Sequence, residues 1–345
     1  MGASLPRNAL VKPRHRSGPA ARAHVRWRDR PWWPWAKRIL SVLFFGAVLY
    51  LLVRYARNIQ WSEVWESVTE TPRPMLALAI ALAATSHLLY SCFDLIGRRY
   101  TGHTLPVHKT MAVNFTSYAF NLSLGSLVGG VAFRYRLYSR LGLKNGVITR
   151  VLTISMLTNW VGYMLLAGLL FALRPLELPP SWKMGNHGLQ WVGVALILVA
   201  VAYLVACIVR GGRTWEWRGH EMYLPRWRMA VFQLVISVVN WSVIGAVIWV
   251  LLGQRVPYTD VLSVLLIGAI AGVIAHVPAG LGVLEFVFVT LLGHVLGEPR
   301  LIGALLVYRA IYYILPLAIA SVLYLAMEVH AKRSHRAMRL RGSEA

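Results

Sequence analysis

The chain has 345 residues, of which 57% are hydrophobic and 14% are charged, and its formal net charge is +23. A soluble protein of this length has far more charged residues, and apolar runs of about 18 residues or more recur here, so the composition excludes a soluble domain and indicates a polytopic α-helical membrane protein. No recognition motif accompanies the positive charge, so it marks cytoplasmic loops better than a nucleic-acid partner.

Residues 1–38 form a basic segment with ten Lys and Arg residues and a single acid, Asp29. It contains no apolar core, so it is not expected to be a cleavable signal peptide. We predict a disordered cytoplasmic tail that contacts anionic lipid headgroups. Residues 329–345 form a second basic tail, also expected in the cytoplasm.

Between the tails the hydropathy pattern predicts eight apolar segments. They cover residues 39–53, 75–97, 111–133, 147–173, 189–209, 229–252, 261–296 and 301–328. The seventh is long, and Pro278, Gly280 and Gly282 break any helix within it. An interrupted helix and the glutamate that follows, Glu285, are both costly in lipid, so together they indicate a site that handles a polar substrate.

Loop charges indicate how these segments cross the membrane. Segment 111–133 lies between two basic loops, and both face the cytoplasm only if this segment is a re-entrant hairpin. Segment 261–296 must likewise enter and leave from the outer side, because loop 210–228 and the C-terminal tail are both basic. This arrangement places 28 of the 36 Lys and Arg residues, and both termini, in the cytoplasm.

The predicted fold is therefore all-α, with about six full spans and two oppositely oriented re-entrant hairpins. Residues 39–173 and 189–328 show the same order of two spans, a hairpin and a span, but start on opposite sides. This pattern predicts an inverted-topology repeat within a single transmembrane domain, 39–328, as is common in secondary transporters.

Ionisable residues within the apolar segments are candidates for the site. Glu285 and Arg309 are natural partners, either as a structural ion pair or as a pair that holds a charged headgroup. Arg134 follows Gly129 and Gly130, and an arginine beside such a glycine pair can bind phosphate. The alternative for Arg134 is a simple cytoplasmic anchor.

Other polar residues have plainer interpretations. Asp94 is expected to pair with Arg98 at helical spacing, and Asn159 and Asn240 to join helices through hydrogen bonds. His276 can relay protons or be structural. A separate aromatic group can line a lipid groove or simply pack, and it consists of Tyr308, Tyr312 and Tyr313.

No nucleophile motif, Walker loop or His/Cys cluster is present in the sequence. We therefore predict no catalytic residues, no metal and no cofactor. The expected protein is not an enzyme.

Three strings carry a resemblance to a known family. They are Gly129-Gly130-x-x-x-Arg134-x-x-Leu137, Pro278-Ala279-Gly280-Leu281-Gly282-Val283-x-Glu285 and Tyr308-Arg309-x-x-x-Tyr313-x-x-Pro316. Over residues 39–328 the chain resembles the lysylphosphatidylglycerol synthase transmembrane (flippase-like) domain family, including its stand-alone members. The resemblance implies a multi-pass protein of the bacterial inner membrane, related to a domain that moves aminoacylated phospholipid between leaflets.

The main hypothesis is a lipid transporter or flippase-like protein for an anionic or zwitterionic phospholipid. Arg134 and Arg309 would attract the phosphate, and Glu285 would balance Arg309 or contact an amine. The expected substrate-binding residues are Gly129, Gly130, Arg134, Pro278, Gly280, Gly282, Glu285, Tyr308, Arg309 and Tyr313.

Two other functions stay open at this point. One is a non-transporting accessory or scaffold protein for a lipid-metabolic enzyme. The other is an intramembrane transferase with Glu285 or His276 as base. Besides phospholipid and the bilayer, a lipid-metabolic enzyme and a second copy of the chain are the candidate partners.

Overall fold

The computed structural model describes residues 61–174, 186–212, 214–217, 220–275 and 282–341, and the single positions Trp35, Ile39, Leu43, Gly46, Tyr50, Val53, Arg57, Leu176 and Leu178. The chain divides into two compact units, Met1–Leu49 and Tyr50–Ala345, and the helices below belong to the second. The predicted tail 1–38 and segment 39–53 fall almost wholly outside the described residues, as do His276, Pro278 and Gly280.

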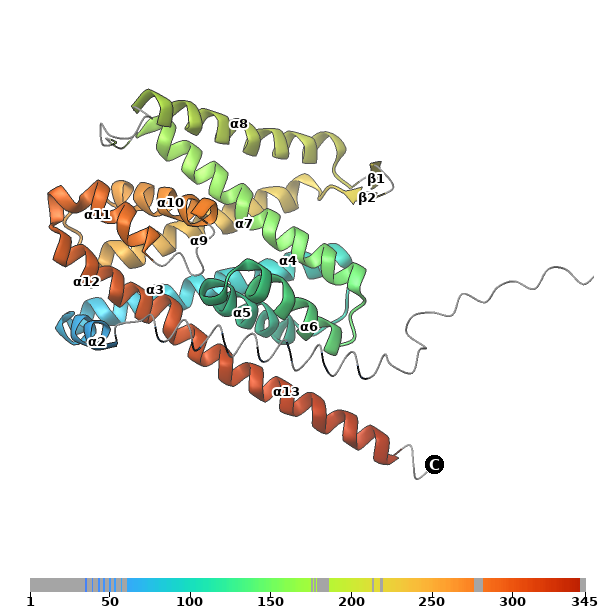
Figure 1. The fold of residues 1–345 in the computed structure, drawn as a ribbon. Coiled ribbons are helices and arrows are strands. Elements are labelled where there is room, and N and C mark those ends of the chain that lie inside the picture. Colours follow the sequence, from blue (N-terminus) through green and yellow to red (C-terminus); the bar gives the residue numbers. More distant parts are fainter. Residues whose placement is uncertain are drawn as a thin grey trace, which may run out of the picture. The chain divides into compact units, whose positions relative to one another are not determined.

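The described elements are almost all helical (Figure 1). In chain order they are α2 (Trp61–Glu70), α3 (Arg73–Ser91), α4 (Phe93–Thr101), α5 (Val107–Leu124), the π-helix η2 (Ser126–Ala132), α6 (Phe133–Arg140), α7 (Asn145–Leu173), α8 (Asn186–Arg210), β1 (Thr214–Trp217), β2 (His220–Tyr223), α9 (Trp227–Leu251), α10 (Tyr258–Ala275), α11 (Val283–Leu296), α12 (Glu298–Arg309), the π-helix η4 (Ala310–Ile314) and α13 (Leu315–Arg341).

Six of the described helical stretches are long and apolar enough to cross a membrane. They are Arg73–Thr101, Asn145–Leu173, His187–Arg210, Trp227–Leu251, Tyr258–Ala275 and Glu298–Glu328. Five coincide with predicted spans, and the sixth is the first arm of the predicted segment 261–296. The all-α, multi-pass fold class is therefore confirmed.

One short strand pair was not predicted. β1 and β2 pair antiparallel, with Thr214 opposite Tyr223 and Trp217 opposite His220. They lie within the basic loop 210–228, between α8 and α9. This hairpin is an appendage of a loop and leaves the helical architecture unchanged.

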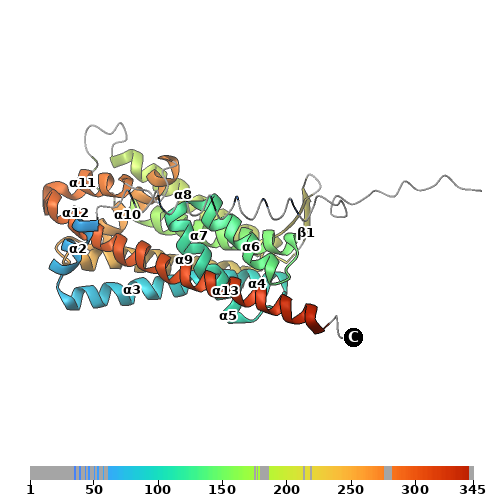
Figure 2. The ribbon, with the colours of Figure 1, turned by 60° about the horizontal axis from the view of Figure 1, so that its bottom comes forward.

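α7 and α9 lie at the centre of the bundle (Figure 1). α7 packs against α8, α9 and α4, and α3 packs against α9 (Figure 1). α13 lies along α5 (Figure 2). α7, α8 and α9 are apolar on every side. Their inner faces contribute to the hydrophobic core, while outer faces such as that of α8 stay exposed where lipid would surround them.

The first interrupted segment reverses direction at Gly125. This glycine ends α5 with φ 86°, a backbone conformation that a side chain disfavours. η2 then packs back on α5, and a Cβ on Gly129 would lie only 2.1 Å from the backbone nitrogen of Asn121. The close approach of the two arms therefore requires glycine at position 129.

The second interrupted segment has a similar plan. α10 and α11 pack against each other on either side of the break, and a Cβ on Gly268 would lie 2.8 Å from Leu284 Cδ1. Gly282, with φ 79°, immediately precedes α11. Both segments are thus two packed helical arms. Their entry from opposite membrane sides, and the inverted repeat, stay predictions.

Candidate functional site

The first buried cluster surrounds Arg134 of α6. The guanidinium Nε lies 3.3 Å from Asp94 Oδ2 of α4, and Nη2 donates to Asn114 Oδ1 of α5 and, at 3.3 Å, to Ser155 Oγ of α7. Only 2% of Arg134 is exposed, and Asp94 is completely buried. Four helices therefore meet around one neutralised charge pair.

The packing of α4 on α7 explains why these residues meet. A Cβ on Gly97 would lie 3.0 Å from the Val151 backbone, so the absent side chain lets α4 approach α7 closely. Asp94, one turn earlier on α4, then reaches the centre of the cluster. Its Oδ2 also accepts a hydrogen bond from the Tyr138 hydroxyl at 2.8 Å.

The expected pairing of Asp94 with Arg98 is wrong. Asp94 pairs with Arg134, while Arg98 Nε donates to the Leu105 carbonyl at 2.7 Å and closes the loop after α4. The physical reason is burial, because a carboxylate removed from solvent requires a cation that is buried with it. Arg98 lies on the same helix as Asp94, but its side chain turns to the following loop, so it does not supply this buried cation.

Gly129 and Gly130 have a packing role in this structure. Both lie against Asn121, and the Gly129 N–H donates to the Gly125 carbonyl at 2.9 Å. That amide is therefore engaged within the hairpin and is not directed at a phosphate.

The second cluster lies where α11 meets the end of α12. Arg309 binds Glu285 in a bidentate manner, through Nε to Oε1 and through Nη2 to Oε2 at 2.9 Å. The Gly282 N–H also donates to Oε2, at 3.0 Å. The predicted pairing of Glu285 with Arg309 is thus confirmed, and Gly282 is part of the same arrangement.

This second pair is less enclosed than the first. The Glu285 side chain is 20% exposed and that of Arg309 is 7% exposed. Arg309 also lies over the Tyr313 ring, with 5.4 Å between the guanidinium carbon and the ring centroid. A cation that is stacked on an aromatic face and paired with a partly accessible carboxylate suits the recognition of a polar group in an apolar setting.

The π-helix η4 follows Arg309 directly. Such wide turns often mark functional sites. Here the turn places Tyr308 and Tyr312 in a stack with ring centroids 5.3 Å apart, and the Tyr312 hydroxyl lies 2.7 Å from Ser86 Oγ and 3.1 Å from the Tyr118 hydroxyl. Ser86 donates to Asn240 Oδ1 at 2.8 Å. One polar network therefore joins α3, α5, α9 and η4.

Hydrogen bonds between helices answer two of the earlier expectations. Asn240 does join helices through its side chain, whereas Asn159 does so through its backbone carbonyl, which accepts from Ser237 Oγ at 3.0 Å. Ser86 and Tyr118 were not predicted. No charge, glycine or proline marks them in the sequence.

A third ion cluster was also missed. Glu328 of α13 contacts Arg140 and Arg136 of α6, the latter at 4.0 Å. The available signal was a lone acid at the end of the predicted apolar segment 301–328. The cluster ties α13 to the end of the first interrupted segment.

These features define the class of the protein. It is an α-helical multi-pass membrane protein in which two interrupted helical segments each contribute to a buried or half-buried ion pair. The chain belongs to the family described as the lysylphosphatidylglycerol synthase TM region, whose model matches residues 38–320. This confirms the resemblance seen in the three sequence strings.

The similar proteins fall into two groups. Stand-alone relatives include inner membrane protein YbhN of Escherichia coli, 47% identical over 89% of this chain and 96% of its own length, and the uncharacterized protein slr0712 of Synechocystis, 30% identical over 89% and 94%. The phosphatidylglycerol lysyltransferase of Staphylococcus haemolyticus is 25% identical over 83% of this chain but only 34% of its own length.

Proposed function

We propose that this chain binds phospholipid headgroups at the Glu285–Arg309 pair and moves them between the leaflets of the bacterial inner membrane, without catalysing a reaction. Its termini lie in the cytoplasm. The observation that carries the proposal is a bidentate ion pair, partly accessible, set at a helix break within the membrane-spanning part of the chain.

Arg309 is the residue proposed to make first contact with the lipid phosphate. Its fork can bind a phosphate as it binds Glu285, because both anions accept two parallel hydrogen bonds. A headgroup that arrives at this site would exchange with Glu285, and the released carboxylate could contact an amine on the same headgroup. The family and its phosphatidylglycerol lysyltransferase relatives support a phospholipid as the substrate class.

Arg134 has a later role in this proposal. In the present conformation it is buried against Asp94, so a headgroup reaches it only after the contact between α4 and α6 opens. The inverted arrangement of two interrupted segments provides the motion, since one repeat can rock against the other around a fixed site.

The test is headgroup movement in reconstituted vesicles, followed with fluorescently labelled phosphatidylglycerol and an impermeant quencher. Arg309→Ala is expected to slow protein-dependent movement by about tenfold or more, because it removes a charge-assisted, bidentate contact. Arg300→Ala, at an exposed position of the same helix, is the matched control and is expected to behave as the wild type.

A charge exchange separates binding from mere structure. The double variant Glu285→Arg, Arg309→Glu keeps an ion pair but moves the cation. If the pair binds phosphate, the double variant folds and stays inactive. Recovery of lipid movement in it would assign the pair a structural role, and movement absent from the wild-type vesicles would favour the scaffold alternative.

A further inference from the structure

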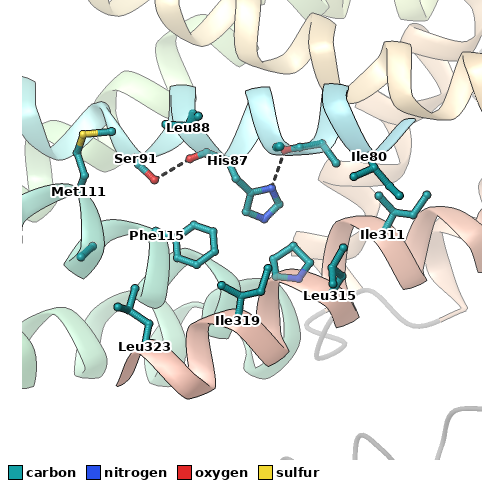
Figure 3. A pocket seen from close by; sticks show the side chains of 14 residues that line it. Ile80, His87, Leu88, Ser91, Met111, Phe115, Ile311, Leu315, Ile319 and Leu323 are labelled. Carbon is teal, nitrogen blue, oxygen red and sulfur yellow. Dashed lines mark hydrogen bonds between the residues drawn. The ribbon is translucent and has the colours of Figure 1, made fainter. Parts of the chain in front are cut away.

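A groove separate from the two ion pairs lies between α3, α5 and α13 (Figure 3). It has a volume of about 410 Å³, within the range of small-molecule sites, and fourteen residues line it. Exposed Leu88, Leu315 and Ile319 form part of its lining. Because these positions belong to candidate membrane spans, the groove opens toward lipid.

His87 is the unusual residue of this groove. Figure 3 shows its ring projecting from α3 toward the space that Phe115 and Ile319 also line. The residue is only 3% exposed and lies in the middle of the candidate span Arg73–Thr101. A histidine at this depth needs a partner for each ring nitrogen.

One nitrogen has its partner. His87 Nδ1 lies 3.0 Å from the Ala83 carbonyl. A carbonyl can only accept, so Nδ1 carries the hydrogen, and in the neutral ring Nε2 is left as an acceptor. Nε2 is buried and has no hydrogen-bond partner among the residues that the structure describes. An unpaired buried acceptor is costly, so it favours a ligand that brings a donor.

The rest of the lining limits that ligand. Ser91 is the other polar side chain of the groove, and its hydroxyl donates to the His87 carbonyl at 2.7 Å. No Lys, Arg, Asp or Glu is among the lining residues, so a phosphate here would be uncompensated. A water molecule would also lack the two to four polar partners it requires.

We infer that this groove is a binding site for a neutral lipid with a free hydroxyl, of the diacylglycerol type, whose O–H donates to His87 Nε2. The hydrocarbon tail occupies the apolar lining and leaves toward the bilayer beside Leu88 and Ile319. The site is independent of lipid transport at Arg309, because a neutral lipid can bind here whether or not phospholipid moves.

The experiment uses the whole chain in phosphatidylcholine nanodiscs and a photoactivatable diacylglycerol with the reactive group in its acyl chain. Three competitors are compared: unlabelled diacylglycerol, its 3-O-methyl ether, and phosphatidylglycerol. The methyl ether lacks the hydroxyl hydrogen that would be donated to His87 Nε2, so it is expected to compete about tenfold more weakly than free diacylglycerol. Phosphatidylglycerol is expected to compete more weakly than diacylglycerol as well.

Variants assign the effect to the groove. His87→Phe keeps a ring but removes the acceptor, so free and capped lipids should compete equally. His294→Phe, an exposed histidine of α11, should retain the preference. Ala84→Phe fills the groove from an exposed position and should abolish labelling, whereas Ala81→Phe, exposed on the same helix outside the lining, should not.

Three results would overturn the inference. They are equal competition by free and capped diacylglycerol in the wild type, competition by phosphatidylglycerol at the same concentration as diacylglycerol, and unchanged labelling of Ala84→Phe. None of them bears on headgroup movement at Arg309, so failure here is distinct from failure of the proposed transport.

Discussion

The substitution Gly129→Ala tests the close packing of η2 on α5 in the first interrupted segment. The added Cβ would lie 2.1 Å from the Asn121 nitrogen and 2.2 Å from the Phe120 carbonyl carbon. Both are backbone atoms of α5, which no change of rotamer can move. Ordinary contacts begin near 3.5 Å, so η2 must shift by more than 1 Å. Overpacking of this kind lowers the free energy of unfolding by about 1–3 kcal/mol. Because the neighbour here is rigid backbone, we expect a loss at the upper end of that range.

The measurement is thermal unfolding of the purified protein in one detergent, compared with a second glycine variant. Gly303 is also within a helix, but its added Cβ would lie 3.7 Å from Ser67 Oγ, an ordinary contact. Alanine there gains up to about 1 kcal/mol of helix propensity. We expect Gly129→Ala to unfold several degrees below the wild type and Gly303→Ala to unfold at or above it. Equal unfolding temperatures for Gly129→Ala and the wild type would refute the close packing of η2 on α5.

Three further predictions concern charges and topology. Arg134→Ala is expected to destabilise the protein by about 3–5 kcal/mol because it leaves Asp94 buried and unpaired, and adding Asp94→Asn should recover part of the loss in the same unfolding assay. Glu328→Ala should cost about 1 kcal/mol or less, because its partners Arg136 and Arg140 of α6 are partly exposed and can turn to solvent, and a loss above 3 kcal/mol would contradict this. The predicted topology can be tested in a background without the two native cysteines, with an impermeant thiol reagent applied from outside. Lys144→Cys should resist this reagent and Glu298→Cys should react with it. The reverse pattern would reject the predicted topology.

Hydropathy and charge were sufficient for five of the six candidate spans that the structure describes and for one of the ion pairs. Spans are predictable because a bilayer imposes a length of about 20 apolar residues on any crossing helix. Glu285 and Arg309 were predictable because they are an acid and a base in neighbouring apolar segments, so each is the other's natural partner. Their bidentate geometry and the Gly282 amide contact depend on local backbone placement, which composition does not encode.

The failures have a common cause. Asp94 was assigned to Arg98 because residues four apart on a helix lie on the same face, and sequence alone shows only such local neighbours. Its true partner, Arg134, lies 40 residues away on α6. The hydrogen bonds of Ser86 and Tyr118 likewise depend on how α3, α5, α9 and η4 cross. Side chains of these types are common in buried helices, so nothing in the sequence separates them from ordinary packing residues.

The difference between the two ion pairs bears on the order of events in the proposed transport. The Arg134–Asp94 pair is enclosed by four helices, and breaking it would expose two charges to an apolar core. The Glu285–Arg309 pair is partly open, and the Gly282 amide gives the carboxylate a second partner when the arginine leaves. A headgroup that binds Arg309 would therefore break a less enclosed ion pair than a headgroup that binds Arg134. If lipid movement proceeds through both pairs, binding at Arg309 comes first, and opening of the Arg134 pair is the slower step.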